Sequence, residues 1–415
     1  MKALLINTSD IDGGAARAAY RLHQGLQAIG VASQMLVRSK FSGDSTVIPH
    51  RTTLAKMGPT LDELPLKLYP KRDRTMFSLQ SVPDDIAPKV AQLAPDVLSL
   101  HWFCNAYMQV ETLAKFNKPL VWTLHDMWAF TGGCHVSQEC DRYTDFCGAC
   151  PQLKSTRNWD LSRWTWQRKA RAWKQLDLTI VTPSSWLANC ARSSSLFKHT
   201  RIEVIPHGLN TNKYKPIDKR VARELLHLPQ DKQIVLFGAS GNDKNKGFYL
   251  LHPALQNLSV SGWQDKIEVL IFGPYQPDNS VDLGFKTQYL GRLQDDLSLA
   301  LAYSAADVMV VPSMQESFGQ TASESLACGT PVVAFNTTGL KDIVEHQQNG
   351  YLASPFEIED LARGIAWILE NSDRHQKLSS RSREKAEQEF TLELQARRYL
   401  SLFSEVVNKN PNIAC

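Results

Sequence analysis

The feature that most constrains the fold is the alternation of short apolar runs with helical patterns along most of the chain. Strand-sized runs separated by helix-sized segments are typical of βαβ units, whose strands are parallel and whose helices cover both faces of the sheet. The runs fall into two sets, and each set predicts its own doubly wound sheet. The expected strands are Ala3 to Asn7, Ala32 to Val37, Val97 to Leu100, Leu120 to Leu124 and Thr179 to Thr182, followed by Ile234 to Gly238, Ile267 to Phe272, Val308 to Val311 and Val332 to Phe335.

The domain organisation follows from length and from one proline-rich connection. A chain of 415 residues is too long for one ordinary core. Between the two sets, the segment from Val204 to Pro216 carries prolines, a glycine and polar turn residues. We therefore expect one Rossmann-like domain over residues 1–208 and a second over residues 209–390. The amphipathic C-terminal helix, about residues 391–415, is expected to pack back on the first domain.

Two open α/β sheets bind ligands beyond the carboxyl ends of their strands, so we expect the two domains to face a cleft. The formal net charge of +4 is too small to indicate nucleic-acid binding. No stretch approaches the ~18 apolar residues that span a bilayer, and the apolar run at the N-terminus is too short for a signal peptide. These features favour a cytoplasmic protein.

Polar residues follow strands in the first domain. Gly13 and Gly14 open a helix after the first strand, where backbone amides can approach an anion closely. A tight strand-to-helix turn explains the same pair equally well. His125 follows the fourth expected strand and can donate to a sugar hydroxyl, while Asp126 could fix its tautomer or cap the next segment. The alternative is a structural histidine.

The second domain offers a basic loop and two glutamates. Lys244 and Lys246 lie in a glycine-containing loop after its first strand, where ammonium groups suit a diphosphate; a solvated basic loop is the alternative. Glu316 precedes a short expected helix that ends near Cys328, and Glu324 lies within it. Two carboxylates there could each accept paired hydroxyls, whereas a capping role is the plainer explanation for one of them.

Taken together, these segments resemble the retaining glycosyltransferases of family 4, which have the two-Rossmann GT-B architecture. The resemblance is carried by the E-x(7)-E motif, Glu316-Ser-Phe-Gly-Gln-Thr-Ala-Ser-Glu324, within a Pro-Ser…Gly-Thr-Pro-Val-Val-Ala context. The connection from Ile205 to Pro216 and the segment from Thr337 to Val344 are also similar to the family. The resemblance covers nearly the whole chain and is closest to bacterial enzymes that build cell-surface polysaccharides.

The resemblance implies a site and a reaction. Glu316 would contact donor-sugar hydroxyls, His125 would sit against the donor sugar, and Lys246 would bind the diphosphate. Glu324 would hold the ribose, and Gly14 would lie in the glycine-rich loop near phosphate and acceptor. The donor-binding residues expected besides these catalytic ones are Glu324, Phe318, Gly319, Gly14, Gly13, Lys244 and Ser317.

The implied reaction moves a sugar from a nucleoside diphosphate sugar to an acceptor hydroxyl with retained configuration, and it needs no catalytic metal. The alternatives are a GT-B-like sugar-nucleotide epimerase, which needs further acid/base groups, and a non-catalytic nucleotide-sugar-binding protein. Two departures from the family stand out. The arginine that many members have before the lysine is missing in Ala239 to Asp243, where Lys244 is a possible substitute, and Thr338-Gly339 replaces a double glycine.

Four of the eight cysteines are clustered in one segment. Cys147 and Cys150 form a chelating pair, which Cys134 and Cys140 could complete as a structural zinc site; unpaired or oxidised thiols are the alternative. The following segment, Lys154 to Lys174, mixes four tryptophans with basic residues. This mixture favours either a peripheral membrane surface that presents a glycan or lipid-linked acceptor, or ordinary packing of the tryptophans.

Overall fold

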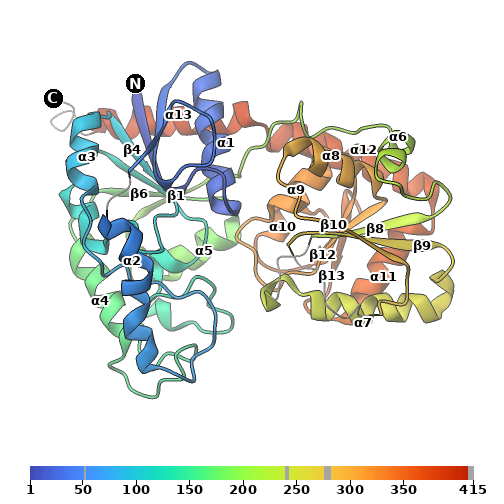
Figure 1. Cartoon of the computed structure of the whole chain (residues 1–415), viewed down its shortest axis with the longest axis horizontal. Coiled ribbons are helices and arrows are strands. Elements are labelled where there is room, and N and C mark those ends of the chain that lie inside the picture. The colour runs from blue at the N-terminus through green and yellow to red at the C-terminus, as the bar shows by residue number, and fades with distance from the viewer. Residues whose placement is uncertain (51–52, 239–242, 275–281, 410–415) are drawn as a thin grey trace. The chain divides into compact units, whose positions relative to one another are not determined.

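The computed structural model describes residues 1–50, 53–238, 243–274 and 282–409. The chain folds into two compact units, one formed by Met1–Gly208 together with the chain from Leu392, the other by Leu209–Thr391 (Figure 1). Part of the predicted phosphate loop, residues 239–242, and Cys415 lie outside the described residues.

The first unit is built on a parallel sheet. Its strands are β1 (Lys2–Ser9), β2 (Ala32–Ser39), β3 (Val47–Pro49), β4 (Val97–Leu100), β5 (Leu120–Thr123), β6 (Leu178–Thr182) and β7 (Arg201–Val204). They pair in the order β3-β2-β1-β4-β5-β6-β7. The strands β2 and β3 are added on one side of β1 and those from β4 on the other, so the switch point of the strand order lies between β1 and β4. A ligand site is therefore expected beyond the carboxyl ends of β1 and β4.

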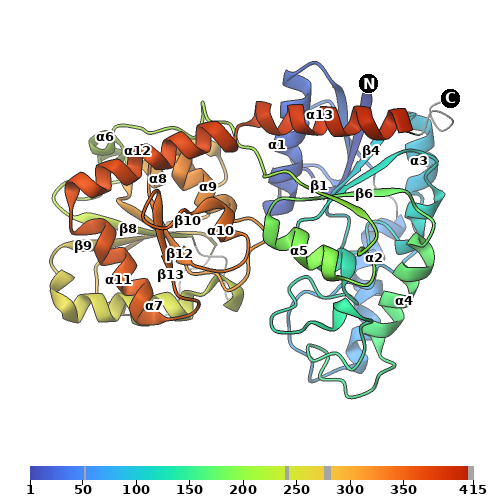
Figure 2. The same ribbon diagram turned by 180° about the vertical axis from the view of Figure 1, so that it is seen from behind.

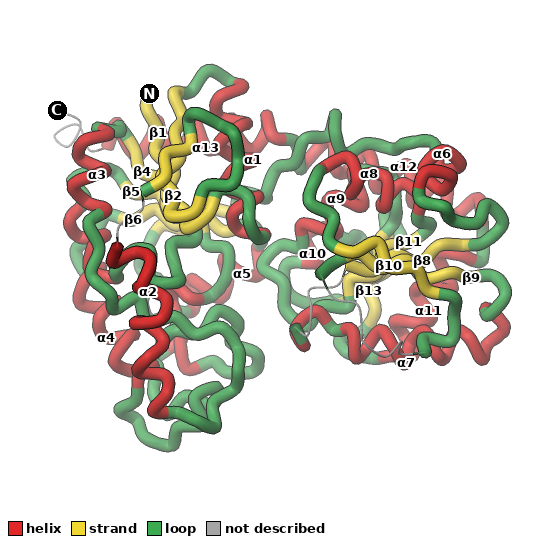
Figure 3. Tube along the Cα trace, viewed as in Figure 1, coloured by secondary structure: helices red, strands yellow, loops and turns green. Residues whose placement is uncertain are grey.

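Helices cover both faces of this sheet, as Figure 3 shows. The helices of the first unit are α1 (Gly14–Ala28), α2 (Thr53–Glu63), α3 (Ile86–Leu93), α4 (Leu161–Trp173), α5 (Ser185–Ser193) and α13 (Leu392–Lys409), with the short helices η1 (Leu64–Leu68), η2 (Val110–Lys115), η3 (Trp128–Phe130) and η4 (Arg142–Thr144). Because side chains alternate along β1, Leu5 faces the cluster of α1 and α13, while Leu4 faces that of α3, α4 and α5.

The C-terminal helix α13 lies beside α1 in the first unit (Figure 2). The contact is close at Gly25, where a Cβ atom would lie 2.9 Å from the carbonyl oxygen of Leu392. Tyr399 and Phe403 of α13 are fully buried against the sheet. Burial of these aromatic side chains, rather than helix propensity, holds α13 on the first unit.

The second unit has the same design. Its strands are β8 (Gln233–Gly238), β9 (Ile267–Phe272), β10 (Thr287–Gly291), β11 (Val308–Val311), β12 (Val332–Phe335) and β13 (Gly350–Ala353). They are parallel and pair in the order β10-β9-β8-β11-β12-β13. The helices are α6 (Lys219–Leu225), η5 (Lys244–Lys246), α7 (Phe248–Leu258), η6 (Ser259–Trp263), α8 (Asp296–Ala305), α9 (Gln320–Ala327), α10 (Leu340–Ile343), α11 (Ile358–Leu369) and α12 (Ser372–Glu389).

The core of the second unit again has two layers. Leu236 of β8 packs with α8, α9 and α10, and Phe237 packs with α7 and α11. The switch of strand order lies between β8 and β11, so the carboxyl ends of these two strands define the ligand edge of this sheet.

The predicted α/β fold with two parallel sheets is confirmed, and every expected strand is present. The strands that the sequence did not predict are β3, β7, β10 and β13, which lie at the edges of the two sheets. Arg201–Val204 and Thr287–Gly291 are only partly buried, so they carry no apolar run that would reveal them.

Candidate active site

In the second unit, two loops meet at the carboxyl ends of β8 and β11. The backbone N–H of Met314 donates to the carbonyl of Asn245 at 2.8 Å, and the Asn245 amide donates to the carbonyl of Gln315 at 2.7 Å. Gly247 has a φ of 71°, and a Cβ atom there would lie 1.9 Å from the carbonyl oxygen of Pro312. Only glycine permits this approach, which fixes η5 against the loop that carries Glu316.

Lys246 and Glu316, both predicted as catalytic, form an ion pair. The Lys246 Nζ lies 2.6 Å from Glu316 Oε1, and the two side chains are 33% and 17% exposed. Burial alone lowers the pKa of Lys246, but the charge and hydrogen bond of Glu316, with the charge of Asp243, raise it above its ordinary value. The ammonium is therefore fully charged at neutral pH. At the ligand edge, this ion pair can open, so that the lysine binds a phosphate and the glutamate binds hydroxyls.

The backbone of Glu316 is held by the segment in which the chain departs from the family. The Thr338 hydroxyl accepts a hydrogen bond from the Glu316 N–H at 3.0 Å, and the Gly339 N–H donates to the Glu316 carbonyl at 2.9 Å. A Cβ atom at Gly339 would lie 2.5 Å from the Ser317 carbonyl oxygen. The second glycine is therefore required by close packing, whereas Thr338 supplies a hydroxyl that a glycine lacks.

Helix α9 begins between the two glutamates, as predicted. Gly319 caps it with a φ of 105°, and the buried Phe318 packs edge-on against Phe390 with ring centroids 5.6 Å apart. Glu324 is buried within α9, where it accepts a hydrogen bond from the Tyr303 hydroxyl at 2.9 Å. Burial, with the charge of Glu324, raises the pKa of Tyr303 well above its usual value, so the phenol stays a donor. Lys244 lies exposed on η5.

In the first unit, Gly13 caps α1 with a φ of 97°, and Gly14 is the first residue of the helix. No other residue would touch a Cβ atom at Gly13 among the described atoms, so its backbone angle alone calls for glycine. The preceding loop is held by the buried Asp10, whose carboxylate accepts from the N–H groups of Phe41 and Ser42 at 2.8–3.1 Å. The helix start is thus fixed before any ligand arrives.

His125 is part of a chain of imidazoles that the sequence did not reveal. Its Nε2 lies 3.1 Å from Nδ1 of His101, whose Nε2 lies 3.2 Å from the Ser99 hydroxyl, and its ring stacks on His207 with centroids 5.1 Å apart. Burial lowers the pKa of His125 to about 4, and burial together with the neighbouring imidazoles lowers the pKa of His101 and His207. All three rings are neutral at pH 7.

Asp126 does not fix the tautomer of His125. Its Oδ2 lies 2.7 Å from His135 Nδ1 and accepts from the Trp102 indole at 2.8 Å, while Oδ1 accepts from the Trp128 N–H. The capping alternative is therefore the one observed, because the carboxylate points toward η3. His101 is the residue that engages His125; His101 follows β4 as His125 follows β5, a signal that sequence reasoning could have used.

In the described part of the chain, none of the four clustered cysteines forms a disulfide bond. Cys134, Cys140, Cys147 and Cys150 are free thiols, and Cys134 and Cys150 pack in an apolar cluster with Leu66 and Phe77. Burial raises the pKa of Cys147 to about 12 and that of Cys134 further. Across the described ranges, no group of three or more His, Cys, Asp or Glu side chains is arranged to hold a metal ion. This geometry gives the zinc site no support, and zinc stays a prediction.

Helix α4 is more deeply buried than its basic sequence suggested. Lys169 is fully buried, with its ammonium donating to the carbonyls of Trp128 and Thr131 and lying 3.6 Å from the centroid of the Trp128 ring. Burial lowers the pKa of Lys169 to about 7. Trp173 is also buried, whereas Trp159 and Trp164 are 68% and 40% exposed. Packing therefore accounts for Lys169 and Trp173, and contact of this segment with a membrane stays a prediction.

Comparison with known proteins identifies the family. Residues 12–213 match the Glycosyltransferase Family 4 profile, and residues 218–385 match that of the glycosyl transferases group 1. The two matches cover most of the chain, which belongs to the family 4 glycosyltransferases. The GT-B fold class expected from this resemblance is also found in solved structures. Sucrose-phosphate synthase from Thermosynechococcus elongatus superposes with a TM-score of 0.71 at 21% identity, over 99% of this chain and 100% of that one.

Some relatives are more identical over less than half of the chain, and others are less identical over nearly all of it. D-inositol 3-phosphate glycosyltransferase from Streptosporangium roseum is 35% identical over 40% of this chain, and the match spans 41% of that protein. The putative colanic acid biosynthesis glycosyl transferase WcaC from Escherichia coli is 24% identical over 88% of this chain and 90% of its own length. Anabaena HepE, solved with UDP and glucose, has a TM-score of 0.65 at 17% identity, over 97% of this chain and 99% of that one.

Among the helices of the described ranges, none combines the length and the apolar character that are needed to cross a bilayer.

Proposed function

We propose that the chain transfers a sugar from a nucleoside diphosphate sugar to a hydroxyl of a glycan or lipid-linked acceptor, with retained configuration, in the synthesis of a surface polysaccharide or glycoconjugate. The observation that carries this proposal is the Lys246–Glu316 pair, 2.6 Å apart at the ligand edge of the second sheet. Membership of family 4 and the likeness to WcaC over most of both chains support the same reaction class.

The pair divides a donor into two recognised parts. The ammonium of Lys246 suits the diphosphate. When Lys246 pairs with the diphosphate instead of with Glu316, the Glu316 carboxylate is free to accept hydrogen bonds from sugar hydroxyls. The start of α9, next to Glu316, adds partial positive charge for the same diphosphate. Glu324, with one oxygen held by Tyr303, is proposed to accept from the ribose.

The reaction we propose needs no side-chain nucleophile. The bond between the anomeric carbon and the phosphate oxygen breaks, the acceptor oxygen bonds to the same face of that carbon, and the acceptor proton passes to the leaving diphosphate. Lys246 stabilises the charge that develops on the diphosphate, which is the electrostatic contribution expected to dominate. His125, with one ring nitrogen engaged by His101 and a neutral ring, is proposed to offer its other nitrogen to a substrate hydroxyl.

The first unit, which we propose binds the acceptor, is also proposed to contact a membrane surface. We call the segments Met57–Met76 and Asp141–Arg163 the apolar lobe; they are joined by the hydrogen bond from the Asp73 N–H to the Gln152 carbonyl. Leu68, Met76 and Trp159 of this lobe are 78%, 59% and 68% exposed. Exposed apolar side chains beside lysines and arginines fit the interface of an anionic bilayer.

The membrane proposal is tested by flotation with phosphatidylglycerol vesicles and with phosphatidylcholine vesicles. We expect flotation with the anionic vesicles only, and its loss when Leu68 and Trp159 are both replaced by serine. Replacement of the exposed Val260 of the second unit by serine is the control. Equal recovery in the soluble fraction with both vesicle types contradicts the proposal.

The catalytic proposal is tested in two steps. A thermal-shift screen with nucleoside diphosphates and their sugars identifies the donor, because a ligand that binds only the folded state raises the melting temperature. Release of the nucleoside diphosphate is then measured for the unchanged chain and for Glu316→Ala. We expect release to be abolished in Glu316→Ala but not in Glu359→Ala, an exposed control. Unchanged turnover in Glu316→Ala would sink the assignment.

A further inference from the structure

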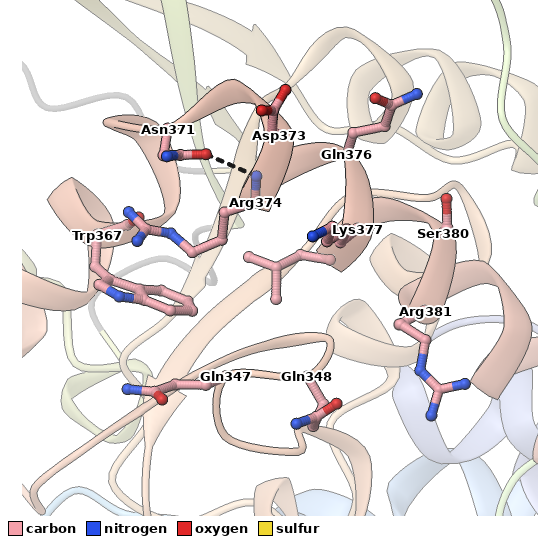
Figure 4. A pocket seen from close by; sticks show the side chains of 11 residues that line it. Gln347, Gln348, Trp367, Asn371, Asp373, Arg374, Gln376, Lys377, Ser380 and Arg381 are labelled. Carbon is pink, nitrogen blue, oxygen red and sulfur yellow. Dashed lines mark hydrogen bonds between the residues drawn. The ribbon is translucent and has the colours of Figure 1, made fainter.

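The hollow beside α12 in the second unit does not select a ligand. Its volume is about 1010 Å³, and Figure 4 shows that Asp373, Arg374, Lys377 and Arg381 of α12 line it. Arg374 and Arg381 are each paired with a glutamate, and the exposed carboxylate of Asp373 lies one turn of helix before Lys377. The charges around this hollow therefore cancel, and they favour neither an anion nor a cation.

The hydrogen-bonded chain from Ser99 to His125 in the first unit is more specific. Ser99 is fully buried within β4, and its hydroxyl lies 3.2 Å from Nε2 of His101. Nδ1 of His101 lies 3.1 Å from Nε2 of His125. Both rings are neutral, because burial lowers their pKa values. A neutral imidazole has one N–H donor and one acceptor nitrogen, so His101 must donate through one nitrogen and accept through the other.

This chain of hydrogen bonds can run in two directions, and Ser99 distinguishes them. If His101 donated from Nε2, the hydrogen of the Ser99 hydroxyl would need another acceptor. Within the described residues this hydroxyl has no second hydrogen-bond partner, and a buried donor without an acceptor is costly. If Ser99 donates instead, only oxygen lone pairs stay unfilled, which proteins tolerate better. The chain therefore runs from the Ser99 hydroxyl to His101, and from Nδ1–H of His101 to Nε2 of His125.

His101 is fixed well enough to position its neighbour. Its backbone N–H donates to the carbonyl of Ile6 at 2.9 Å, and its own carbonyl accepts from the Trp122 indole at 3.2 Å. The ring of His125 is held on its face as well, because His207 stacks on it with an interplanar angle of 21°. The hydrogen bond at Nε2 and this stacking together restrict the orientation of the His125 ring.

We propose that His101 is a positioning residue that holds His125 in the Nδ1–H tautomer, with Ser99 setting the direction of the hydrogen bonds. In free histidine the Nε2–H tautomer is the more abundant one, so the protein imposes the less common form. Nδ1 of His125 has no hydrogen-bond partner among the described residues. This nitrogen is therefore available to a ligand, as a donor and not as an acceptor.

The inference deepens the proposed function and rests on it as far as the substrate is concerned. With Nε2 occupied and Nδ1 protonated, His125 cannot take a proton from an acceptor hydroxyl. This agrees with the proposed passage of that proton to the leaving diphosphate. His125 can donate to a hydroxyl or carboxylate oxygen of the sugar, whereas a protonated amino group offers only donors and is disfavoured there.

The tautomer is measured by long-range proton–nitrogen NMR on the full chain with isotope-labelled histidine rings, at neutral pH and without substrate. His125→Gln and His101→Leu assign the signals by their loss. We expect the unchanged chain to show a protonated Nδ1 and an unprotonated Nε2 at both His101 and His125.

Two variants of nearly equal shape separate the hydrogen bond from packing. His101→Asn keeps a donor near the position of Nδ1 and should preserve the Nδ1–H form of His125. His101→Leu has no donor and should shift His125 to a mixture in which the Nε2–H form dominates. Turnover should be about tenfold lower in His101→Leu than in His101→Asn, the order expected for one neutral hydrogen bond. His199→Leu, at an exposed histidine of the first unit, is the control and should leave the His125 signals unchanged.

Three outcomes overturn the inference. A protonated Nε2 on His101 or His125 in the unchanged chain would reverse the direction of the hydrogen bonds. Unchanged tautomer populations of His125 in His101→Leu would show that His101 does not position it, and equal turnover of the two variants would remove the tautomer from the reaction. The proposed function fails separately: a chain with the Nδ1–H tautomer that transfers no sugar contradicts only that function.

Discussion

Two lysines show how differently the two units use the same side chain. Lys246 of the second unit is partly exposed and paired with Glu316, and its pKa lies above the ordinary value. Lys169 of the first unit is fully buried among carbonyl groups and an indole, and its pKa falls to about 7. A carboxylate partner outweighs the cost of partial burial for Lys246, whereas carbonyl dipoles do not outweigh full burial for Lys169.

The comparison teaches what each region is suited to bind. The second unit keeps full charges at its ligand edge, which suits the anionic part of a donor. The first unit keeps its groups neutral after β4 and β5, where burial suppresses protonation of His101, His125 and His207. Neutral imidazoles can form hydrogen bonds with hydroxyls without adding a charge to this part of the first unit. Four substitutions break or sharpen this contrast.

The largest effect is expected for Lys246→Met. Without the ammonium, the leaving diphosphate loses a preorganised positive charge, and turnover should fall by about 10²–10³-fold. Nucleoside diphosphate release under single-turnover conditions measures this. Lys244→Met, the exposed neighbour on η5, should cost at most about tenfold. If both replacements have the same effect, the paired lysine has no special role.

Lys169→Met should change how stability depends on pH. Between pH 7 and about pH 10 the unfolded chain holds a proton on Lys169 that the folded chain has lost, so the free energy of unfolding rises with pH by up to about 1.4 kcal/mol per unit. The methionine variant should lack this rise. Urea-unfolding midpoints at pH 7, 8 and 9 test it, with the exposed Lys174→Met as control. Parallel curves for wild type and Lys169→Met would contradict the lowered pKa.

Tyr303→Phe removes the hydroxyl that donates to Glu324 at 2.9 Å. A buried carboxylate left without this donor costs about 1–3 kcal/mol of stability. We expect a lower melting temperature for the second unit and weaker binding of the nucleoside diphosphate. A double-mutant cycle with Glu324→Gln isolates the interaction; additive effects of the two substitutions would show that the hydrogen bond contributes nothing.

Thr338→Val should have the smallest effect. Valine keeps the shape and the positive φ of 51° but loses the hydroxyl that accepts from the Glu316 N–H. The expected cost is about 1 kcal/mol, with a few-fold loss of turnover as Glu316 loosens. Thr338→Ser keeps the hydroxyl and should therefore retain both the stability and the turnover of the unchanged chain. Thermal unfolding and turnover of the two variants decide the matter, and equal values would remove Thr338 from the account.

Most of the fold could be predicted from the sequence because central strands of parallel sheets are buried on both faces. Val308–Val311 and Val332–Phe335 are continuous apolar runs, and their predicted bounds match the structure. The edge strand β7 contains Arg201 and Glu203, which face solvent in part, so it resembles a loop in the sequence. Edge strands are defined by pairing with a neighbour, and a single sequence does not display that pairing.

The site could be predicted in its residue types but not in its pairings. Lys246 and Glu316 are 70 positions apart in the chain, and their ion pair depends on the contact of Gly247 with Pro312. Lys169 stands among basic neighbours in the sequence, Arg168 and Arg171, yet it is fully buried because the turn of α4 directs it inward. Roles that depend on which face of a helix is buried need the tertiary structure.

The central claim is that Lys246 holds the diphosphate while Glu316 holds the sugar of one donor. The direct measurement is the melting-temperature rise caused by the nucleoside diphosphate, and by its sugar conjugate, in wild type, Lys246→Met and Glu316→Gln. The account predicts that Lys246→Met loses the rise with both ligands. Glu316→Gln should keep the rise with the diphosphate and lose the additional rise caused by the sugar. Full retention of both rises in Lys246→Met would contradict the account.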